Sequence, residues 1–133
     1  MKLSYLFLIL FLSFISCTEI KTENPKTAFE YWSGEKPEEN LNIIFAEYWR
    51  SAHWSYEYTF CMKFKPTEKW WNEFIKSNNL IKDMETTSRF ENAPKFFNPS
   101  KSSIQFRPKE KLNDSRYYRD IVTGICYIYE IQL

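Results

Sequence analysis

The chain has 133 residues, enough for one domain of ordinary size, and its 18 basic and 17 acidic residues leave a net charge of +1. A near-neutral chain whose basic residues are scattered lacks the charge that nucleic-acid binding needs, so we expect no nucleic-acid partner. The only two glycines are Gly34 and Gly124, which excludes glycine-rich loops that cradle phosphate groups.

The first residues have the three parts of a secretory signal. Lys2 supplies a positive charge, residues 3–15 form a largely apolar run of 13 residues, and the small Ser16 precedes Cys17. A transmembrane helix needs about 20 apolar residues, so the run is too short to span a bilayer in this way. A short membrane anchor, or a conventional signal cut at another position, is the alternative interpretation.

The residues Phe14-Ile15-Ser16-Cys17 resemble the lipobox of bacterial lipoproteins, with Phe14 where that family more often has leucine. The resemblance implies that residues 1–16 are a signal peptide, removed by signal peptidase II, and that Cys17 is diacylated and anchors the chain to a membrane. Several acyl chains anchor a protein stably, whereas one chain binds marginally. In enterobacterial members, an aspartate after the cysteine favours retention in the inner membrane. This chain has Thr18 at that position, which favours the outer membrane.

Cleavage before Cys17 removes one charged residue, Lys2, and leaves 117 residues with equal numbers of basic and acidic side chains. Residues 17–26 are mostly polar and contain a proline, so we expect them to form a flexible lipidated tether. Residues 27–133 then form a single globular domain.

The first part of the domain predicts a short helix and a strand. Residues 27–33 can form one or two helical turns before Gly34, and residues 35–40 have the composition of a loop. The pattern then alternates strictly, which predicts a half-buried strand from Tyr48 to Lys65. Residues 41–47 either extend this strand or form a preceding one. One face of the strand is rich in rings and consists of Trp54, Tyr56, Tyr58, Phe60, Met62 and Phe64.

A helix is predicted between Pro66 and Asn79. Thr67 is a suitable N-terminal cap, and Glu68 lies in the first turn, where the helix dipole favours a negative charge. Asn78 supplies a stop signal. An apolar stripe suited to packing on a sheet is formed by Trp70, Trp71, Phe74 and Ile75.

Residues 80–101 contain prolines, asparagines and serines and predict a long loop, in which we expect Phe96 and Phe97 to pack inward. Residues 103–107 alternate as a short strand that ends at Pro108. Two further strands, Ser115 to Val122 and Ile125 to Leu133, are separated by Thr123-Gly124, a suitable two-residue hairpin turn.

These elements together predict an α+β fold. Segregated strands favour an antiparallel meander sheet, with one main amphipathic helix packed on its aromatic face. In this arrangement both Cys61 and Cys126 lie opposite the aromatic face, so that neighbouring strands allow a disulfide between them in an oxidising compartment. Such a bond stabilises by about 2–4 kcal/mol. The alternative, which the sequence supports equally well, is that both cysteines are buried free thiols.

Candidate chemistry is sparse. With Cys17 acylated, Cys61, Cys126 and the single His53 do not make the four-ligand set of a structural zinc site, and we expect neither a metal nor a cofactor. Ser51, His53, Ser55 and Glu57 share one face of the predicted strand and supply the residue types of a nucleophile, a base and an acid. Same-face neighbours on a strand are about 6.5–7 Å apart, too far for a proton relay, so we predict no catalytic residue.

The candidate binding residues are Trp49, His53, Arg116 and Tyr118, the last two from a run in which charges and rings alternate. Anchor, tether and missing catalytic spacing favour a non-enzymatic protein-binding or inhibitory domain in the cell envelope, comparable in size and export to lipid-anchored immunity proteins. The alternatives are an accessory subunit of an envelope complex, or a small envelope enzyme or glycan-binding module that uses exposed aromatic side chains.

Overall fold

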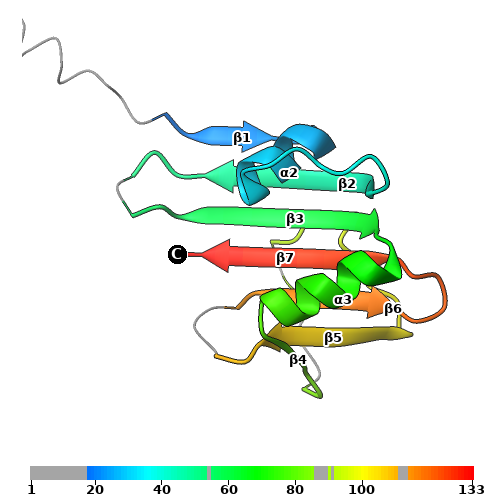
Figure 1. Ribbon diagram of the computed structural model, residues 1–133. Helices are drawn as coiled ribbons and strands as arrows, with labels where there is room; N and C mark the ends of the chain where they lie inside the picture. The colour runs from blue at the N-terminus through cyan, green and yellow to red at the C-terminus, as the bar shows by residue number, and fades with distance from the viewer. Residues whose placement is uncertain (1–17, 54, 86–89, 91, 111–113) are drawn as a thin grey trace, which may run out of the picture.

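A computed structural model describes residues 18–133 apart from positions 54, 86–89, 91 and 111–113 (Figure 1). Within these residues, seven antiparallel strands form one sheet in the order β1-β2-β3-β7-β6-β5-β4. Two helices, α2 (Pro25–Ser33) and α3 (Glu68–Ser77), lie on one face of it, here called the front (Figure 1). The strands are β1 (Ile20–Thr22), β2 (Asn42–Arg50), β3 (Tyr58–Lys65), β4 (Leu80–Lys82), β5 (Ser103–Pro108), β6 (Arg116–Asp120) and β7 (Cys126–Gln132).

The predicted antiparallel α+β class is confirmed, but two helices cover the front rather than one main helix. The sheet consists of two units that meet at its centre. β2 and β3 form a hairpin to which β1 adds, whereas β4 to β7 form a meander in which each strand pairs with the next. The last strand, β7, pairs with β3 and joins the two units. The edge strands β1 and β4 have only three residues each.

The ends of both helices follow from local signals. Thr67 caps α3 by accepting a hydrogen bond from the Trp70 backbone N–H at 3.1 Å, as predicted, and Asn78 ends it. Asn24 caps α2 in the same way, and Gly34 ends it with φ +77°, the left-handed conformation that glycine adopts without strain.

The front core consists of rings stacked between the helices and the sheet. Phe60 and Phe64 of β3 are fully buried there, which confirms that the ring-bearing side of this strand faces inward. The α2 ring of Trp32 stacks on Phe60 with centroids 4.6 Å apart. From α3, Trp71 is 2 % exposed and meets Phe106 edge-on at 5.8 Å, so the predicted helical stripe does pack on the sheet.

The back of the sheet is covered by the long segment after β4. Phe97 packs there against three tyrosines, Tyr118, Tyr127 and Tyr129, with centroids 5.6–5.8 Å away. Phe96 stacks on Phe45 of β2 at 5.5 Å. The expectation that both phenylalanines pack inward is therefore confirmed for Phe97, whereas Phe96 stacks on a ring that is itself 49 % exposed, and the segment forms a third layer behind the sheet.

The strand predicted from Tyr48 to Lys65 is wrong in its first part. The chain turns between β2 and β3, and the Ser51 backbone N–H donates to the Glu57 carbonyl at 2.9 Å across the hairpin. Residues 41–47 belong to the preceding strand, one of the two predicted alternatives. The alternation of ring-bearing and polar residues continues through the turn, so the sequence does not reveal the turn. Rings such as Tyr56, which is 57 % exposed, follow this alternation without packing inward.

The predicted tether also differs from the structure. Residues 20–22 form the edge strand β1, in which Ile20 pairs with Arg50 and Thr22 with Tyr48, and α2 begins at Pro25. The ordered domain therefore starts before residue 27. Local sequence does not predict this strand, because a three-residue edge strand depends on backbone pairing with a distant neighbour.

The last hairpin is confirmed with a longer turn than predicted. Residues 121–125 connect β6 and β7, and Gly124 has φ +72°. The Asp120 carboxylate accepts hydrogen bonds from Val122 and Thr123 backbone N–H groups at 2.8 and 3.0 Å, and from Ser100 at 2.5 Å. These bonds, the one from Ser100 first, lower the pKa of Asp120 to about 2.

The expected common face for the two cysteines is wrong. Cys61 pairs with Tyr129 and Cys126 with Phe64, and this odd offset puts the two side chains on opposite faces of the sheet. The error arose because β3 turns its rings to the front whereas β7 turns its tyrosines to the back. Both cysteines are buried free thiols. Burial raises the pKa of both, in Cys126 to about 12.

We predict that iodoacetamide leaves Cys61 and Cys126 unmodified in the native protein and alkylates both after denaturation without reductant. Burial shields each sulfur and the raised pKa removes the reactive thiolate. Mass spectrometry of the two tryptic peptides measures the modification. Alkylation that needs prior reduction would contradict the assignment of free thiols.

Candidate functional site

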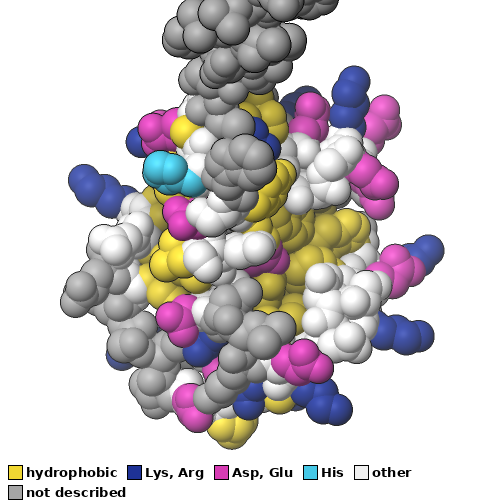
Figure 2. All heavy atoms as spheres, turned by 90° about the vertical axis from the view of Figure 1, so that its left-hand side faces the viewer, with side chains coloured by type: hydrophobic (Ala, Val, Ile, Leu, Met, Phe, Trp, Pro, Cys, Tyr) yellow, Lys and Arg dark blue, Asp and Glu magenta, His cyan; other side chains and the backbone are white. Residues whose placement is uncertain are grey.

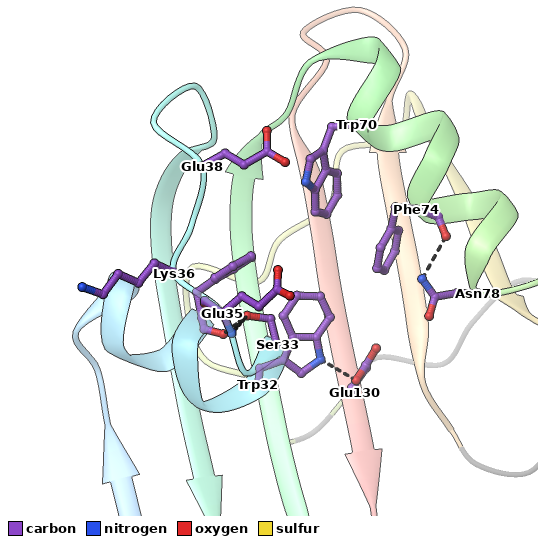
Figure 3. A pocket seen from close by; sticks show the side chains of 10 residues that line it. Trp32, Ser33, Glu35, Lys36, Glu38, Trp70, Phe74, Asn78 and Glu130 are labelled. Atoms are coloured by element: carbon purple, nitrogen blue, oxygen red, sulfur yellow. Dashed lines mark hydrogen bonds between the residues drawn. The ribbon is translucent and has the colours of Figure 1, made fainter.

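A groove opens on the front between α2 and α3, with β7 at its floor (Figure 3). It encloses about 410 Å³, the size range of small-ligand sites. We call it the α2–α3 groove; its lining residues are Phe29, Trp32, Ser33, Glu35, Lys36, Glu38, Trp70, Phe74, Asn78 and Glu130.

Glu130 is the polar centre of the groove floor. Its carboxylate accepts hydrogen bonds from Trp32 Nε1 at 2.7 Å, Tyr58 at 3.0 Å and Tyr117 at 2.7 Å. These donors come from α2, β3 and β6, so one side chain of β7 connects three other elements. Burial, followed by the charge of Glu130, raises the pKa of Tyr58 and of Tyr117, which keeps both phenols protonated as donors.

We predict that Glu130→Ala lowers the free energy of unfolding by about 3 kcal/mol, because three partly buried donors lose their acceptor. Glu130→Gln keeps one acceptor oxygen and has a smaller effect, about 1–2 kcal/mol. Urea unfolding followed by circular dichroism measures both. The control is Glu73→Gln, whose exposed contact with Lys69 at 3.9 Å is worth under about 1 kcal/mol. Equal stability of Glu130→Ala and wild type would refute the assigned role.

Aromatic rings form the walls of the groove. Trp70 stacks on Phe74 with centroids 5.1 Å apart and an interplanar angle of 12°. Trp32 stacks on Phe60 and also lies near Phe29 and Phe74, with centroids 5.5 and 6.2 Å away, and it lines the groove. Trp70 is only partly buried, and its indole N–H has no hydrogen-bond partner among the described residues. The walls therefore offer ring faces together with one donor.

The rim of the groove is acidic. Glu35 and Glu38 are exposed, and neither has an ion-pair partner within the described part of the chain. Figure 3 shows the Glu38 carboxylate turned towards the indole of Trp70, while Lys36 points away from the groove. With Glu130 at the floor, three carboxylates and no inward-pointing cation give the groove a negative charge.

The rim residue Glu38 and the wall residue Trp70 lie at the end of the sheet opposite the chain entry, whereas Glu130 lies towards the chain entry, where it pairs with Phe60 near the start of β3. Glu38 comes shortly before Asn42, where β2 begins, and Trp70 lies in the first turn of α3 at that same end. β2 ends at Arg50, which pairs with Ile20 of β1. Figure 2 views this second end, where hydrophobic side chains show between charged ones.

The structure does not bring the candidate binding residues together. Trp49 is half-buried on β2 and donates its indole N–H to the carboxylate of Glu19, and His53 is exposed in the β2–β3 turn. Arg116 and Tyr118 lie on β6, which is three strand positions from β2 and therefore roughly 14 Å away at the usual strand spacing. Tyr118 is buried, 8 % exposed, beneath the back segment.

Ser51, His53, Ser55 and Glu57 also lie in this turn rather than on a strand. Ser55 donates to the Glu57 carboxylate at 3.0 Å, and Ser51 Oγ is buried without a hydrogen-bond partner among the described residues. The hydrogen bonds of the described residues do not link a serine to His53 as a nucleophile–base pair would require.

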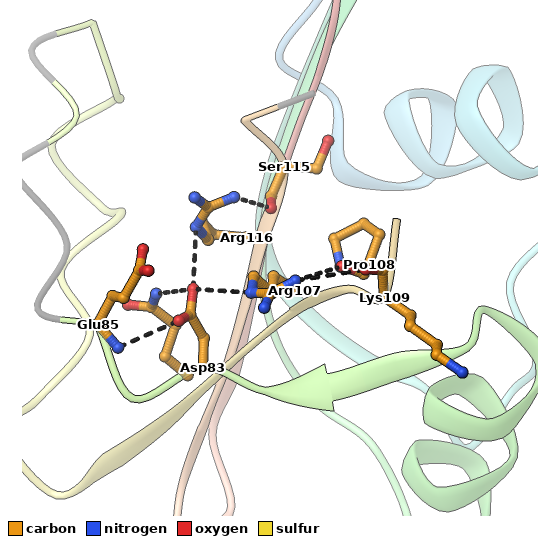
Figure 4. Close-up of polar contacts among 8 residues, drawn as sticks. Asp83, Glu85, Arg107, Pro108, Lys109, Ser115 and Arg116 are labelled. Carbon is orange, nitrogen blue, oxygen red and sulfur yellow. Dashed lines mark hydrogen bonds and ion pairs between the residues drawn. The ribbon is translucent and has the colours of Figure 1, made fainter. Parts of the chain in front are cut away.

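Arg116 instead belongs to a polar cluster that fixes the back segment (Figure 4). Its Nε lies 3.5 Å from the Asp83 carboxylate, and Arg107 Nε lies 3.8 Å from the same oxygen. The Asp83 carboxylate also accepts two hydrogen bonds, one from the Gln105 side chain at 2.9 Å and one from the Glu85 backbone N–H at 3.1 Å. Burial favours a higher pKa, but these hydrogen bonds and the two guanidinium charges outweigh it and lower the pKa of Asp83. Its contribution to stability is therefore present at neutral pH and is lost as the pH falls below about 4.

A second hollow of about 1380 Å³ lies between the back segment and β5. Positions 86–89 and 91 beside it lie outside the described residues. Among its described lining residues, two lysines balance Asp83 and Glu85, so this hollow, unlike the α2–α3 groove, has no excess of one charge.

Comparison of the chain with protein-family models, with curated proteins and with solved structures gave no match. Functional inference therefore depends on the geometry of the domain itself. Over the described ranges, no helix has the length and apolar character needed to cross a membrane. Nor do three or more His, Cys, Asp or Glu side chains of these residues gather as a metal site.

Proposed function

We propose that the protein is a lipid-anchored, non-enzymatic binding domain of the bacterial cell envelope that holds a protein partner at the α2–α3 groove, as an inhibitory or immunity-like protein does. The observation that carries the proposal is the groove itself. It combines partly exposed rings with carboxylates that have no ion-pair partner among the described residues. The side chains of Ser51, His53 and Ser55 lie elsewhere, in the β2–β3 turn, and the described hydrogen bonds do not link either serine to His53. This combination suits recognition rather than bond cleavage.

The short distance between Cys17 and the sheet supports the anchored arrangement. Only Thr18 and Glu19 separate Cys17 from β1. Three successive residues span at most about 11 Å, so acyl chains on Cys17 would hold the β1 end of the sheet at the lipid surface. The tether is then much shorter than the sequence alone predicts.

The position of Glu38 and Trp70 supports capture of a partner from solution. β2 runs for nine residues between the groove end and the β1 end, a length of roughly 27 Å at the usual rise per residue. Glu38 and Trp70 would therefore lie well above the headgroups, at the end of the domain that points away from the membrane. A partner reaches the groove there without displacing lipid.

We predict that Cys17→Ser releases the protein from the membrane fraction and abolishes incorporation of radiolabelled palmitate, because serine lacks the sulfur that forms the thioether bond to the lipid. Ser16→Ala is the matched control, since it keeps a small residue before the cysteine and is expected to remain membrane-bound. Fractionation and immunoblotting measure the distribution. Retention of Cys17→Ser at wild-type levels would overturn the proposed lipid anchor.

We predict that a photoreactive amino acid at position 38 gives a discrete adduct with one envelope protein in living cells, identified by mass spectrometry. The same amino acid at position 30 is the control, because Glu30 is exposed on α2 but does not line the groove. Identical adducts from both positions, or none from either, would argue against a partner at the groove.

A further inference from the structure

We propose that the α2–α3 groove recognises a basic side chain, arginine or lysine, of the partner protein. This inference rests on the proposed function, because it specifies the chemistry of a partner that binds at the same groove. It is carried by the juxtaposition of tryptophan rings with three carboxylates, while Lys36, the lysine among the described lining residues, points away from the groove.

The rings supply the first part of the recognition. A cation is attracted to the face of an indole within about 6 Å of its centroid, and tryptophan is the strongest of the aromatic side chains in this respect. Trp32 and Trp70 each have one face packed, on Phe60 and Phe74, which fixes their planes in advance. A ring held in place loses little freedom when a ligand binds to its open face.

The charge supplies the second part. Glu130 accepts only from neutral donors, an indole and two phenols, so its negative charge is hydrogen-bonded but not neutralised. Glu35 and Glu38 add two carboxylates at the rim, and the one lysine of the lining, Lys36, points outward. A guanidinium or ammonium group between them would offset their mutual repulsion.

The fit favours a side chain over a sugar. The groove of about 410 Å³ has room for one or two side chains and their backbone, not for a folded loop. A neutral sugar can stack on Trp70, but it leaves the charges of Glu35 and Glu38 unbalanced. An arginine satisfies the rings and the carboxylates together, because its planar guanidinium stacks on rings and donates to acids at its edge.

The test uses the purified full-length protein in a non-ionic detergent and two peptides that differ in charge alone. Acetyl-Gly-Arg-Gly-amide carries the guanidinium, and its citrulline analogue has the same shape without the charge. Titration is followed by tryptophan fluorescence, to which Trp32 and Trp70 contribute. We expect a saturable change with the arginine peptide, weakened by added salt, and none with the citrulline peptide.

Two double variants locate the binding. Glu35→Gln with Glu38→Gln is expected to weaken the arginine peptide by about tenfold, since two rim charge pairs are lost. Glu30→Gln with Glu39→Gln removes the same charge from exposed positions outside the groove and is expected to leave affinity unchanged. Circular dichroism confirms that both variants are folded.

Equal binding of the citrulline peptide, equal weakening by both double variants, or no change up to the solubility limit would overturn the inference. Saturable quenching by an N-acetylglucosamine oligomer but not by the arginine peptide would also overturn it, in favour of a glycan site. If the peptide fails while the position-38 adduct forms, the proposed function stands and only the basic side chain is refuted. If the peptide binds but no adduct forms, the groove takes cations and the proposed protein capture fails.

Discussion

The pairing of the last strand with β3 is the constraint on which the rest of the structure depends. β7 lies at the centre of the sheet, so the β1–β3 unit and the β4–β6 strands meet only through it. It also serves both layers, because its side chains alternate between them. Ile128 enters the front core and Tyr129 the back cluster, and Glu130 fixes a ring of α2. Both cores are therefore completed by the strand that comes last among the described elements.

The same strand connects the fold to the proposed site. Glu130 orients Trp32 from one side of the groove, while α3, which follows β3, supplies Trp70 from the other. Trp32 packs on Phe60 of the sheet and Trp70 on Phe74 of its own helix, and both rings line the groove, so stability and the proposed recognition share residues. The acidic rim differs in this respect: Glu35 and Glu38 lie in the connection between α2 and β2, where substitution alters charge without opening the core.

Sequence predicted those parts of the fold that local chemistry decides. Thr67 and Asn78 mark the ends of α3, and Gly124 marks the last hairpin, because caps and turns involve neighbouring residues. It missed what pairing decides, namely β1, the turn before β3, and the faces of Cys61 and Cys126, since alternation gives the two sides of a strand but not its register with another. The groove was missed for the same reason. Its residues come from α2, a loop, α3 and β7, and no spacing in the sequence indicates that Glu38, Trp70 and Glu130 lie together.

The two short edge strands bear on the proposed anchoring of the domain at a membrane. Molecules confined to a lipid leaflet meet one another far more often than the same number in solution, and a long open strand edge would then be a template for sheet-to-sheet association. β1 and β4 have only three residues each, so β1 pairs with Tyr48 to Arg50 of β2 and, among the described strands, leaves residues 42–47 of β2 without a partner on that side. Under the proposed lipid anchor, the edge that remains open to association is therefore this part of β2, whereas the two outermost strands are too short to serve as long templates.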